Sequence, residues 1–247
     1  MNQWLDDFKM AVGFLTRLPV THPDDANFAR AYRVFPVVGA LIGLAVGLVC
    51  LALRKLGVPD LAAAALALGA GALLTGALHE DGLADVADGF GGGRDVEARL
   101  AIMRDSRIGT YGAIVLLVSF TARLSALAAI PDNYVVASLL ATHALARGVL
   151  PAIAANLPYA RPDGLARGGG QPDAAAALIA IGLALPAALL ALPWASSLWA
   201  AVIAGVSGLV VARLALRKIG GQTGDVLGCA EQVAETAVLV LLAARLG

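Results

Sequence analysis

Long apolar runs recur along this chain, and several of them extend over 18 residues or more. A helix of that length crosses a hydrocarbon core of roughly 30 Å. Of the 247 residues, 59% are hydrophobic and only 15% are charged, with a mean hydropathy of +0.80. A water-soluble domain carries about a quarter charged residues. The chain is therefore predicted to be an all-α, polytopic integral membrane helical bundle.

Seven transmembrane helices give the best account of these runs. They are expected near residues 34–53, 61–78, 111–130, 135–155, 174–193, 198–212 and 227–245. The sixth is the weakest, because it reaches spanning length only if Arg213 snorkels or the helix begins near Trp194. No internal repeat and no separable second domain is evident, so residues 1–247 are expected to form a single transmembrane domain.

The distribution of lysine and arginine predicts the orientation. With the N-terminus inside, the inside segments carry thirteen basic residues and the outside segments three. Basic residues favour the cytoplasmic side of a membrane. The N-terminus and the segments 79–110, 156–173 and 213–226 are therefore expected to be cytoplasmic. The formal net charge is zero, so no basic field indicates nucleic-acid binding.

The N-terminal segment, residues 1–33, has apolar side chains at helical spacing. They are Trp4, Leu5, Phe8, Val12 and Leu15. One interpretation is an amphipathic helix on the membrane surface, and the other is a helix packed on the protein's own loops. In the first predicted span, Gly39, Gly43 and Gly47 recur at every fourth residue, a pattern that lets a second helix approach closely.

The second apolar run leads directly into the polar stretch His79-Glu-Asp-Gly-Leu-Ala-Asp-Val-Ala-Asp-Gly89. Asp81, Asp85 and Asp88 are spaced i, i+4, i+7, which places them within an arc of roughly 60° on one helical face. Neighbouring carboxylates repel one another unless a cation lies between them. We expect one helix from residue 61 through Asp88, with Mg²⁺ bound by Asp81, Asp85 and Asp88. The alternative is a solvated acidic helix end.

A short helix is expected after Asp95, which is a suitable N-cap residue. Its predicted end lies near residues 105–107, and Asp105 joins the three carboxylates if this helix folds back. Basic residues that could bind phosphate follow on the predicted cytoplasmic face: Arg104, Arg107, Arg161, Arg167 and Lys218. The alternative for each is a topology determinant near the lipid headgroups.

Charged residues also occur within the predicted spans. Arg147 lies inside the fourth span with His143 one turn before it, and a charge at that depth is usually paired or functional. Arg123 is interpreted as a snorkelling side chain. Glu231 and Glu235, one turn apart in the last span, are expected to be buried or paired, and could neutralise Arg147. The preceding loop, residues 220–228, is rich in glycines whose backbone N–H groups can approach an anion.

Four motifs together resemble the cobalamin synthase family (adenosylcobinamide-GDP ribazoletransferases). They are the acidic stretch above, Ile102-Met-Arg-Asp-Ser-Arg-Ile-Gly-Thr-Tyr-Gly112, Pro158-Tyr-Ala-Arg-Pro-Asp-Gly164, and Gly220-Gly-Gln-Thr-Gly-Asp225 followed by Glu231 and Glu235. They occur in the family's order, and the similarity extends from the N-terminal segment to the last span. The loop 164–172 departs from the family pattern because it is short and glycine-rich.

The resemblance implies an Mg²⁺-dependent enzyme of the bacterial inner membrane with its active site facing the cytoplasm. Such an enzyme joins α-ribazole, or its 5′-phosphate, to adenosylcobinamide-GDP and releases GMP. A homo-oligomer and contacts with upstream corrinoid enzymes are further expectations. Asp88 or Asp105 would accept the hydroxyl proton. The predicted substrate-binding residues are His79, Glu80, Arg104, Arg107, Arg147, Arg161, Lys218, Thr223, Asp225, Glu231 and Glu235.

Three other classes of protein remain as alternatives. A CDP-alcohol phosphotransferase shares the opening Asp85-x2-Asp88-Gly89, but its later Gly-x3-Asp-x3-Asp spacing is missing here. Intramembrane prenyltransferases use aspartate-rich Mg²⁺ motifs of a different spacing. A transporter would use Arg147 and Glu231 along a substrate path, and it predicts charges scattered through the bilayer midplane. The clustering of charges on one predicted face favours an enzyme.

Overall fold

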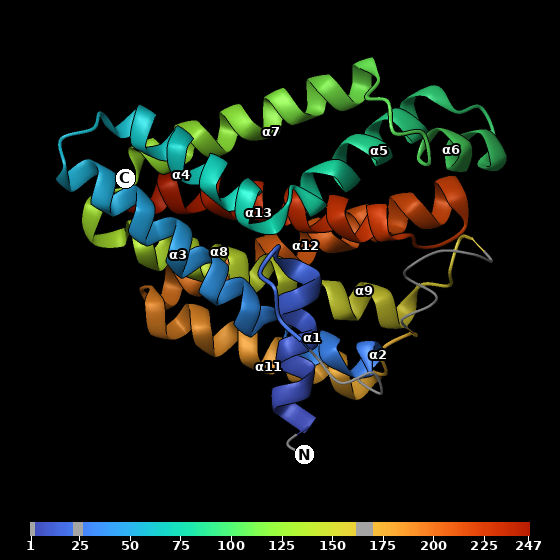
Figure 1. The fold of residues 1–247 in the computed structure, drawn as a ribbon, viewed down its shortest axis with the longest axis horizontal. Coiled ribbons are helices and arrows are strands. Elements are labelled where there is room, and N and C mark those ends of the chain that lie inside the picture. Colours follow the sequence, from blue (N-terminus) through green and yellow to red (C-terminus); the bar gives the residue numbers. More distant parts are fainter. Residues whose placement is uncertain (1–2, 22–26, 162–169) are drawn as a thin grey trace.

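The computed structural model describes residues 3–21, 27–161 and 170–247, and within these ranges the chain is helical (Figure 1). The helices are α1 (Gln3–Leu15), α2 (Phe28–Ala31), the 3₁₀ turn η1 (Tyr32–Val34), α3 (Phe35–Lys55), α4 (Asp60–Thr75), α5 (Leu78–Gly92), α6 (Val96–Ile102), α7 (Thr110–Ala129), α8 (Asp132–Gly148), α9 (Leu150–Asn156), α11 (Ala174–Ala191), α12 (Trp194–Ile219) and α13 (Gly224–Leu246). Within the described ranges, the backbone also forms an isolated parallel β-bridge between Tyr159 and Gln222. The predicted all-α class is confirmed.

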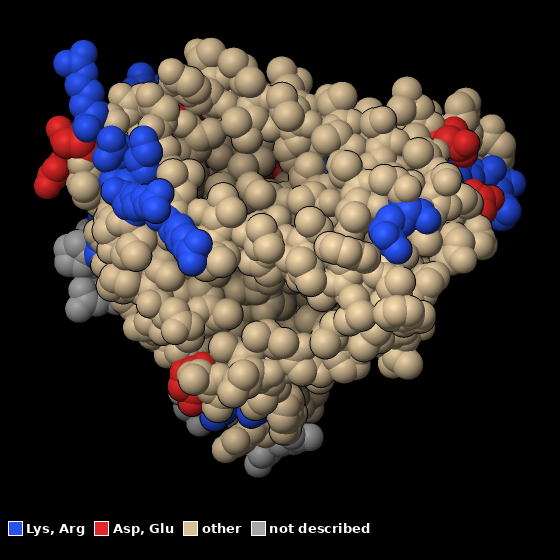
Figure 2. All heavy atoms as spheres, turned by 180° about the vertical axis from the view of Figure 1, so that it is seen from behind, with Lys and Arg blue, Asp and Glu red and all other residues tan. Residues whose placement is uncertain are grey.

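Six helical segments of the described chain are long and apolar enough to cross a membrane, and α4 with α5 makes a seventh if that bent pair counts as one span. Large apolar side chains such as Leu73, Leu117 and Leu190 are exposed on the outside of the bundle. On the face seen in Figure 2, lysines and arginines gather toward the two ends of a broad uncharged surface. The protein is therefore a multi-pass membrane protein. The sixth predicted span is not short, because α12 begins at Trp194 and has 26 residues.

The prediction of one continuous helix from residue 61 through Asp88 is wrong. The chain breaks between α4 and α5, and the two helices meet at 90°. Gly76 ends α4 in the left-handed conformation with φ +67°, and Ala77 follows with φ +55°. The N–H of Ala77 donates to the carbonyl of Ala72 over 2.8 Å, which is the capping pattern that a glycine after a helix commonly forms. As a result α5 turns away from the direction of α4.

The predicted close-packing face of the first span is confirmed by the contact between α3 and α8. A Cβ added to Gly47 would lie 2.8 Å from Cα of Val136 on α8. A Cβ added to Gly39 or Gly43 would collide with backbone carbonyl oxygens of α8. Only hydrogen fits at these positions, so the two helix backbones pack in direct contact.

Helix α1 is attached to the rest of the protein by its buried acidic side chain. Asp7 is fully buried and forms ion pairs of 2.9 Å with Arg30 and 2.7 Å with Arg33. The guanidinium of Arg33 also lies 3.8 Å from the ring centroid of Trp4. Helix α1 therefore packs on the protein, as one of the two interpretations expected, while Trp4 and Leu5 near its start stay about half exposed.

Candidate active site

The acidic helix α5 crosses the start of α13 at two glycines. A Cβ on Gly82 would lie 2.8 Å from the carbonyl oxygen of Asp225 and 3.2 Å from Cα of Gly228. This close approach brings Asp81 and Asp85 within electrostatic range of Asp225. Three carboxylates from two helices therefore gather at the crossing.

The third predicted metal ligand on α5, Asp88, binds backbone N–H groups of another helix. Its two carboxylate oxygens accept hydrogen bonds from the backbone N–H groups of Gly109 (2.7 Å) and Gly112 (2.9 Å), at the start of α7. A Cβ at either glycine would collide with this carboxylate. Asp88 thus caps α7 from a neighbouring helix, where a negative charge also interacts favourably with the helix dipole.

Two motifs that lie far apart in the sequence pair with each other beside the carboxylates. The N–H of Gln222 donates to the carbonyl of Pro158 (2.8 Å), and the N–H of Ala160 donates to the carbonyl of Gln222 (2.9 Å). This pairing places Arg161 with its guanidinium 3.6 Å from the carboxylate of Asp225. Of the third sequence motif, residues 162–164 lie outside the described residues, as do Arg167 and most of the loop 164–172.

A cavity of about 380 Å³ opens at this junction. Its polar wall is formed by side chains from α5, from the segment after α9, from the segment before α13 and from α13: His79, Asp81, Tyr159, Arg161, Gln222, Thr223 and Asp225. The hydroxyl of Thr223 caps α13 by accepting from the N–H of Val226, so the N-terminus of α13 borders the cavity. Carboxylates, a guanidinium and a helix N-terminus together suit a phosphate-bearing ligand with a bound cation.

Beside the cavity lies a buried network of charged side chains, contributed by α5, α7, α8 and α13. Its members are His79, Glu80, Arg123, His143, Arg147, Glu231 and Glu235. Arg123 pairs with Glu235 at 2.7 Å and lies 3.5 Å from Glu80. Arg123 is 4% exposed, so its interpretation as a snorkelling side chain is wrong. Since His79 belongs to the network and also lines the cavity, the network holds the first turn of α5 in place.

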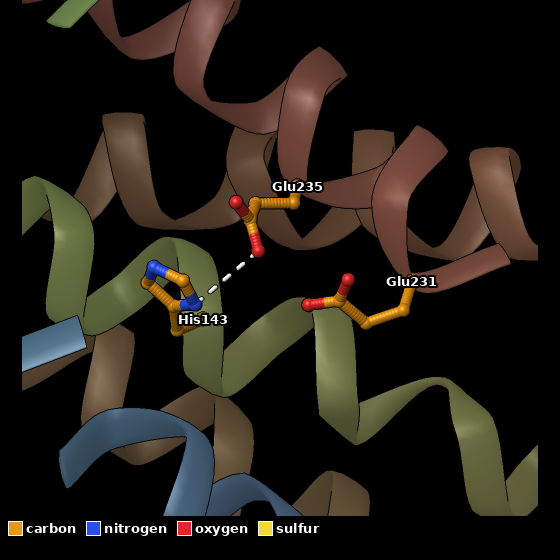
Figure 3. A group of neighbouring side chains, drawn as sticks. All are labelled: His143, Glu231 and Glu235. Carbon is orange, nitrogen blue, oxygen red and sulfur yellow. Dashed lines mark ion pairs between the residues drawn. The ribbon is translucent and has the colours of Figure 1, made fainter. Parts of the chain in front are cut away.

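Arg147 lies at the centre of that network. His143, Glu231 and Glu235 point toward one another from α8 and α13 (Figure 3), with potential metal-ligand atoms within 4.8 Å of each other. One guanidinium nitrogen of Arg147 is hydrogen-bonded to Glu231, lies 2.9 Å from Nδ1 of His143 and lies 3.6 Å from Glu235. The position that a metal ion would take is filled by this cation. The predicted neutralisation of Arg147 by Glu231 and Glu235 is confirmed.

The remaining predicted residues do not line the described cavity. Asp105 follows α6 and pairs with Arg107 at 2.6 Å, with the Arg107 side chain 87% exposed. Hydrogen bonds from Arg107 lower the pKa of Asp105 to about 2. Arg104 is exposed after α6, and Lys218 contributes its backbone carbonyl to a hydrogen bond with Arg99 (2.9 Å). The predicted capping of α6 by Asp95 is confirmed by its hydrogen bond with the N–H of Ala98.

Sequence reasoning missed the apolar part of the cavity lining. It consists of aromatic and aliphatic side chains: Phe14, Phe28, Tyr32, Phe35, Leu78, Leu150 and Leu227. One signal was available, because four of the ten phenylalanine and tyrosine residues of the chain lie at positions 14 to 35 of the N-terminal part. Gln222 was also missed as a structural residue, although its amide donates to the carbonyl of Ala154 over 2.7 Å.

The sequence of this chain is similar to those of known proteins of one family. Residues 7–243 match the family described as Cobalamin-5-phosphate synthase. An adenosylcobinamide-GDP ribazoletransferase of Bradyrhizobium diazoefficiens is 48% identical, with 96% of this chain and 93% of the relative covered. Relatives of the same description from Rhizobium etli and Sinorhizobium medicae are 46% and 44% identical over 97% and 98% of both chains. No solved structure matches the chain.

The matched residues include α5, α13 and the segments that form the cavity, and the similarity covers nearly the whole length of each relative. An enzyme is therefore indicated by the comparisons. The chain belongs to the cobalamin-5-phosphate synthase family, and it is a membrane-spanning transferase of cobalamin biosynthesis.

Proposed function

We propose that this protein joins adenosylcobinamide-GDP to α-ribazole, or to α-ribazole 5′-phosphate, and releases GMP. The observation that carries the proposal is that Asp81, Asp225 and Arg161 line one cavity, with Asp85 in electrostatic range of all three, in a chain of the cobalamin synthase family. A pyrophosphate needs cationic partners, and a ribose hydroxyl needs a nearby proton acceptor. The polar wall of the cavity offers residues for both roles.

The donor set fits Mg²⁺. Asp81, Asp85 and Asp225 offer carboxylate oxygens, the ligands that this hard cation prefers. Asp88 fits the role less well, since backbone N–H groups already bind both of its oxygens. Asp81, Asp85 and Asp225 would therefore hold the ion, which would supply neutralisation of the negative charge on the pyrophosphate.

The chemistry of the proposed reaction is a displacement at phosphorus. The ribose hydroxyl oxygen of α-ribazole forms a bond to the phosphorus that carries the cobinamide, and the bond from that phosphorus to the oxygen of GMP breaks. GMP leaves with the electron pair, and the hydroxyl proton passes to a carboxylate. Asp81 and Asp225 line the cavity, so a carboxylate oxygen of either that the ion leaves free is better placed to accept the proton than Asp88 or Asp105. Arg161 would orient a phosphoryl oxygen.

The proposed location is the bacterial inner membrane, with the cavity on its cytoplasmic side. The positive-inside count supports this orientation. Three of the predicted inside segments also contact one another. Arg99 on α6 donates to the carbonyl of Lys218 over 2.9 Å, and Arg161 donates to the carbonyl of Leu100 over 3.1 Å. These segments therefore share one end of the bundle.

The test is a coupling assay with the full-length protein in detergent or liposomes. Adenosylcobinamide-GDP is supplied with α-ribazole 5′-phosphate or α-ribazole, in Mg²⁺ or in EDTA, and GMP release is measured. We expect GMP release that requires both the ribazole substrate and Mg²⁺. Arg161→Lys and Arg104→Lys form a matched pair of variants, because only Arg161 lines the cavity; we expect the larger loss for Arg161→Lys.

Absence of GMP release in every combination would overturn the proposal. Turnover of a CDP-alcohol and its acceptor would then identify the runner-up reaction, which uses similar carboxylate chemistry. GMP release at an unchanged rate in EDTA would support the proposed coupling reaction but contradict the proposed role of Mg²⁺.

A further inference from the structure

The cavity beside the carboxylates has two chemically different walls. One part of its lining carries Asp81, Arg161 and Asp225, whereas another part is aromatic and aliphatic. The aromatic side chains come from the N-terminal part of the chain, from α1 to the start of α3, whereas the polar ones come from α5, from residues 159–161 and from residues 222–225. A ligand with a planar apolar part attached to a polar part would complement both sets of side chains.

The aromatic wall is a contiguous set of rings from α1, α2, η1 and the start of α3. The rings of Tyr32 and Phe35 stack with centroids 4.6 Å apart, and those of Phe14 and Phe35 stack at 5.9 Å. Phe28 meets Phe14 edge-on at 4.7 Å. Phe35 and Tyr32 are buried, whereas Phe14 is 41% exposed. Phe14 is therefore the ring with most of its surface still open to a ligand.

We propose that this aromatic wall, with Phe14 as its exposed ring, binds the benzimidazole ring of α-ribazole and orients the ribose toward the carboxylates. The assignment rests on the proposed function and adds the residues that select the nucleobase. Stacking of a base on aromatic side chains is favourable because each base has an apolar π-face.

The chemistry of the wall favours benzimidazole over the other planar group of the two substrates, the guanine of the GDP part. Guanine has several hydrogen-bond donors and acceptors on its ring edge, and burying them against Phe14, Phe28 and Leu227 would leave them unpaired. The dimethylbenzimidazole ring has methyl groups on that edge and loses nothing by such burial. A cavity of about 380 Å³ also matches a nucleoside-sized ligand, whereas the corrin ring must remain outside it.

The test compares Phe14→Ala with Phe120→Ala in the coupling assay. Phe120 is a suitable control because it lies on α7, outside the cavity, and is 38% exposed, close to the value for Phe14. For Phe14→Ala we expect the apparent KM for α-ribazole to rise about tenfold, with the KM for adenosylcobinamide-GDP within twofold of wild type. Phe14→Tyr, which keeps the ring, is expected to restore the wild-type KM, and Phe120→Ala should leave both constants unchanged.

Two results in this assay would overturn the proposal. An unchanged KM for α-ribazole in Phe14→Ala is one, and a rise confined to adenosylcobinamide-GDP is the other, because the wall would then bind the guanine end. Binding of α-ribazole alone, measured by calorimetry, separates this inference from the proposed reaction. If the wild-type protein releases no GMP, the proposed reaction is wrong. Tighter binding of α-ribazole by the wild-type protein than by Phe14→Ala would still support the aromatic site. Equal binding by the two proteins would refute it.

Discussion

Asp88 on α5 accepts a 2.7 Å hydrogen bond from the backbone N–H of Gly109, the residue that caps α7. Its other carboxylate oxygen accepts from Gly112. The acidic motif and the Ile108-Gly-Thr-Tyr-Gly112 segment are therefore parts of one structural unit, in which glycine is needed at two positions because a side chain would collide with the carboxylate. The first prediction separates this structural aspartate from those at the cavity.

Asp85→Asn is expected to abolish GMP release while leaving membrane insertion and the thermal stability of the protein unchanged, because Asp85 lies at the carboxylate cluster and not in a packed helix contact. Asp88→Asn is expected to lower stability by about 1–3 kcal/mol, since an amide cannot accept from both N–H groups. Its residual activity should show the wild-type Mg²⁺ dependence. Stability is measured by unfolding in detergent, and turnover by GMP release at a series of Mg²⁺ concentrations. Near-normal turnover of Asp85→Asn would contradict the metal assignment.

Gly82→Ala is expected to reduce turnover strongly although it adds only a methyl group. That methyl group would lie 2.8 Å from the carbonyl of Asp225, so α5 and α13 must move apart and the carboxylates separate with them. Gly69→Ala on α4 is the matched control, because a Cβ there meets nothing within 4 Å. Both variants are compared in the coupling assay at saturating substrates and increasing Mg²⁺. Equal activity of the two variants would show that the crossing does not set the site geometry.

Much of the fold could be predicted because its signals are local. The apolar runs indicate the spans, and the glycines at every fourth residue of α3 indicate its contact with α8. The break after Thr75 was missed although Gly76 is a suitable capping residue, because the apolar run is continuous and hides the turn. Left-handed Ala77 carries no sequence signal at all, since only the tertiary contacts of α5 compensate for its backbone strain.

The candidate site was only partly predictable for a related reason. The i, i+4, i+7 spacing of Asp81, Asp85 and Asp88 places them on one helical face, but it cannot show which neighbouring element each one meets. Asp88 accepts hydrogen bonds at the start of α7, whereas Asp81 and Asp85 lie in electrostatic range of Asp225 on α13. The aromatic wall is likewise a product of tertiary packing, because rings from α1, α2, η1 and α3 pack on one another.

The buried pairing of Arg147 with Glu231 supports a prediction about stability. Arg147→Met should destabilise the protein by about 3–5 kcal/mol, since it leaves the fully buried carboxylate of Glu231 without its cation. The double variant Arg147→Met/Glu231→Leu should recover a large part of that loss, because it removes both charges. Unfolding in detergent, followed by tryptophan fluorescence, gives the coupling between the two sites. A double variant as unstable as the sum of the single variants would show that the two residues do not interact.

The ion pair of Asp105 with Arg107 determines how Asp105 responds to pH. Because Arg107 holds the pKa of Asp105 at about 2, below its ordinary 3.8, the carboxylate stays ionised at all pH values well above 2 and loses this interaction as the pH falls toward 2. Asp105 should therefore contribute no acidic limb to the activity profile between about pH 5 and 8. Arg107→Gln should raise the pKa of Asp105 toward 3.8, which NMR titration of the carboxyl carbon would measure, with little effect on stability because the pair is exposed. In the activity profile, Asp105→Asn should keep the wild-type shape in this pH range; loss of an acidic limb in that variant would instead identify Asp105 as the proton acceptor.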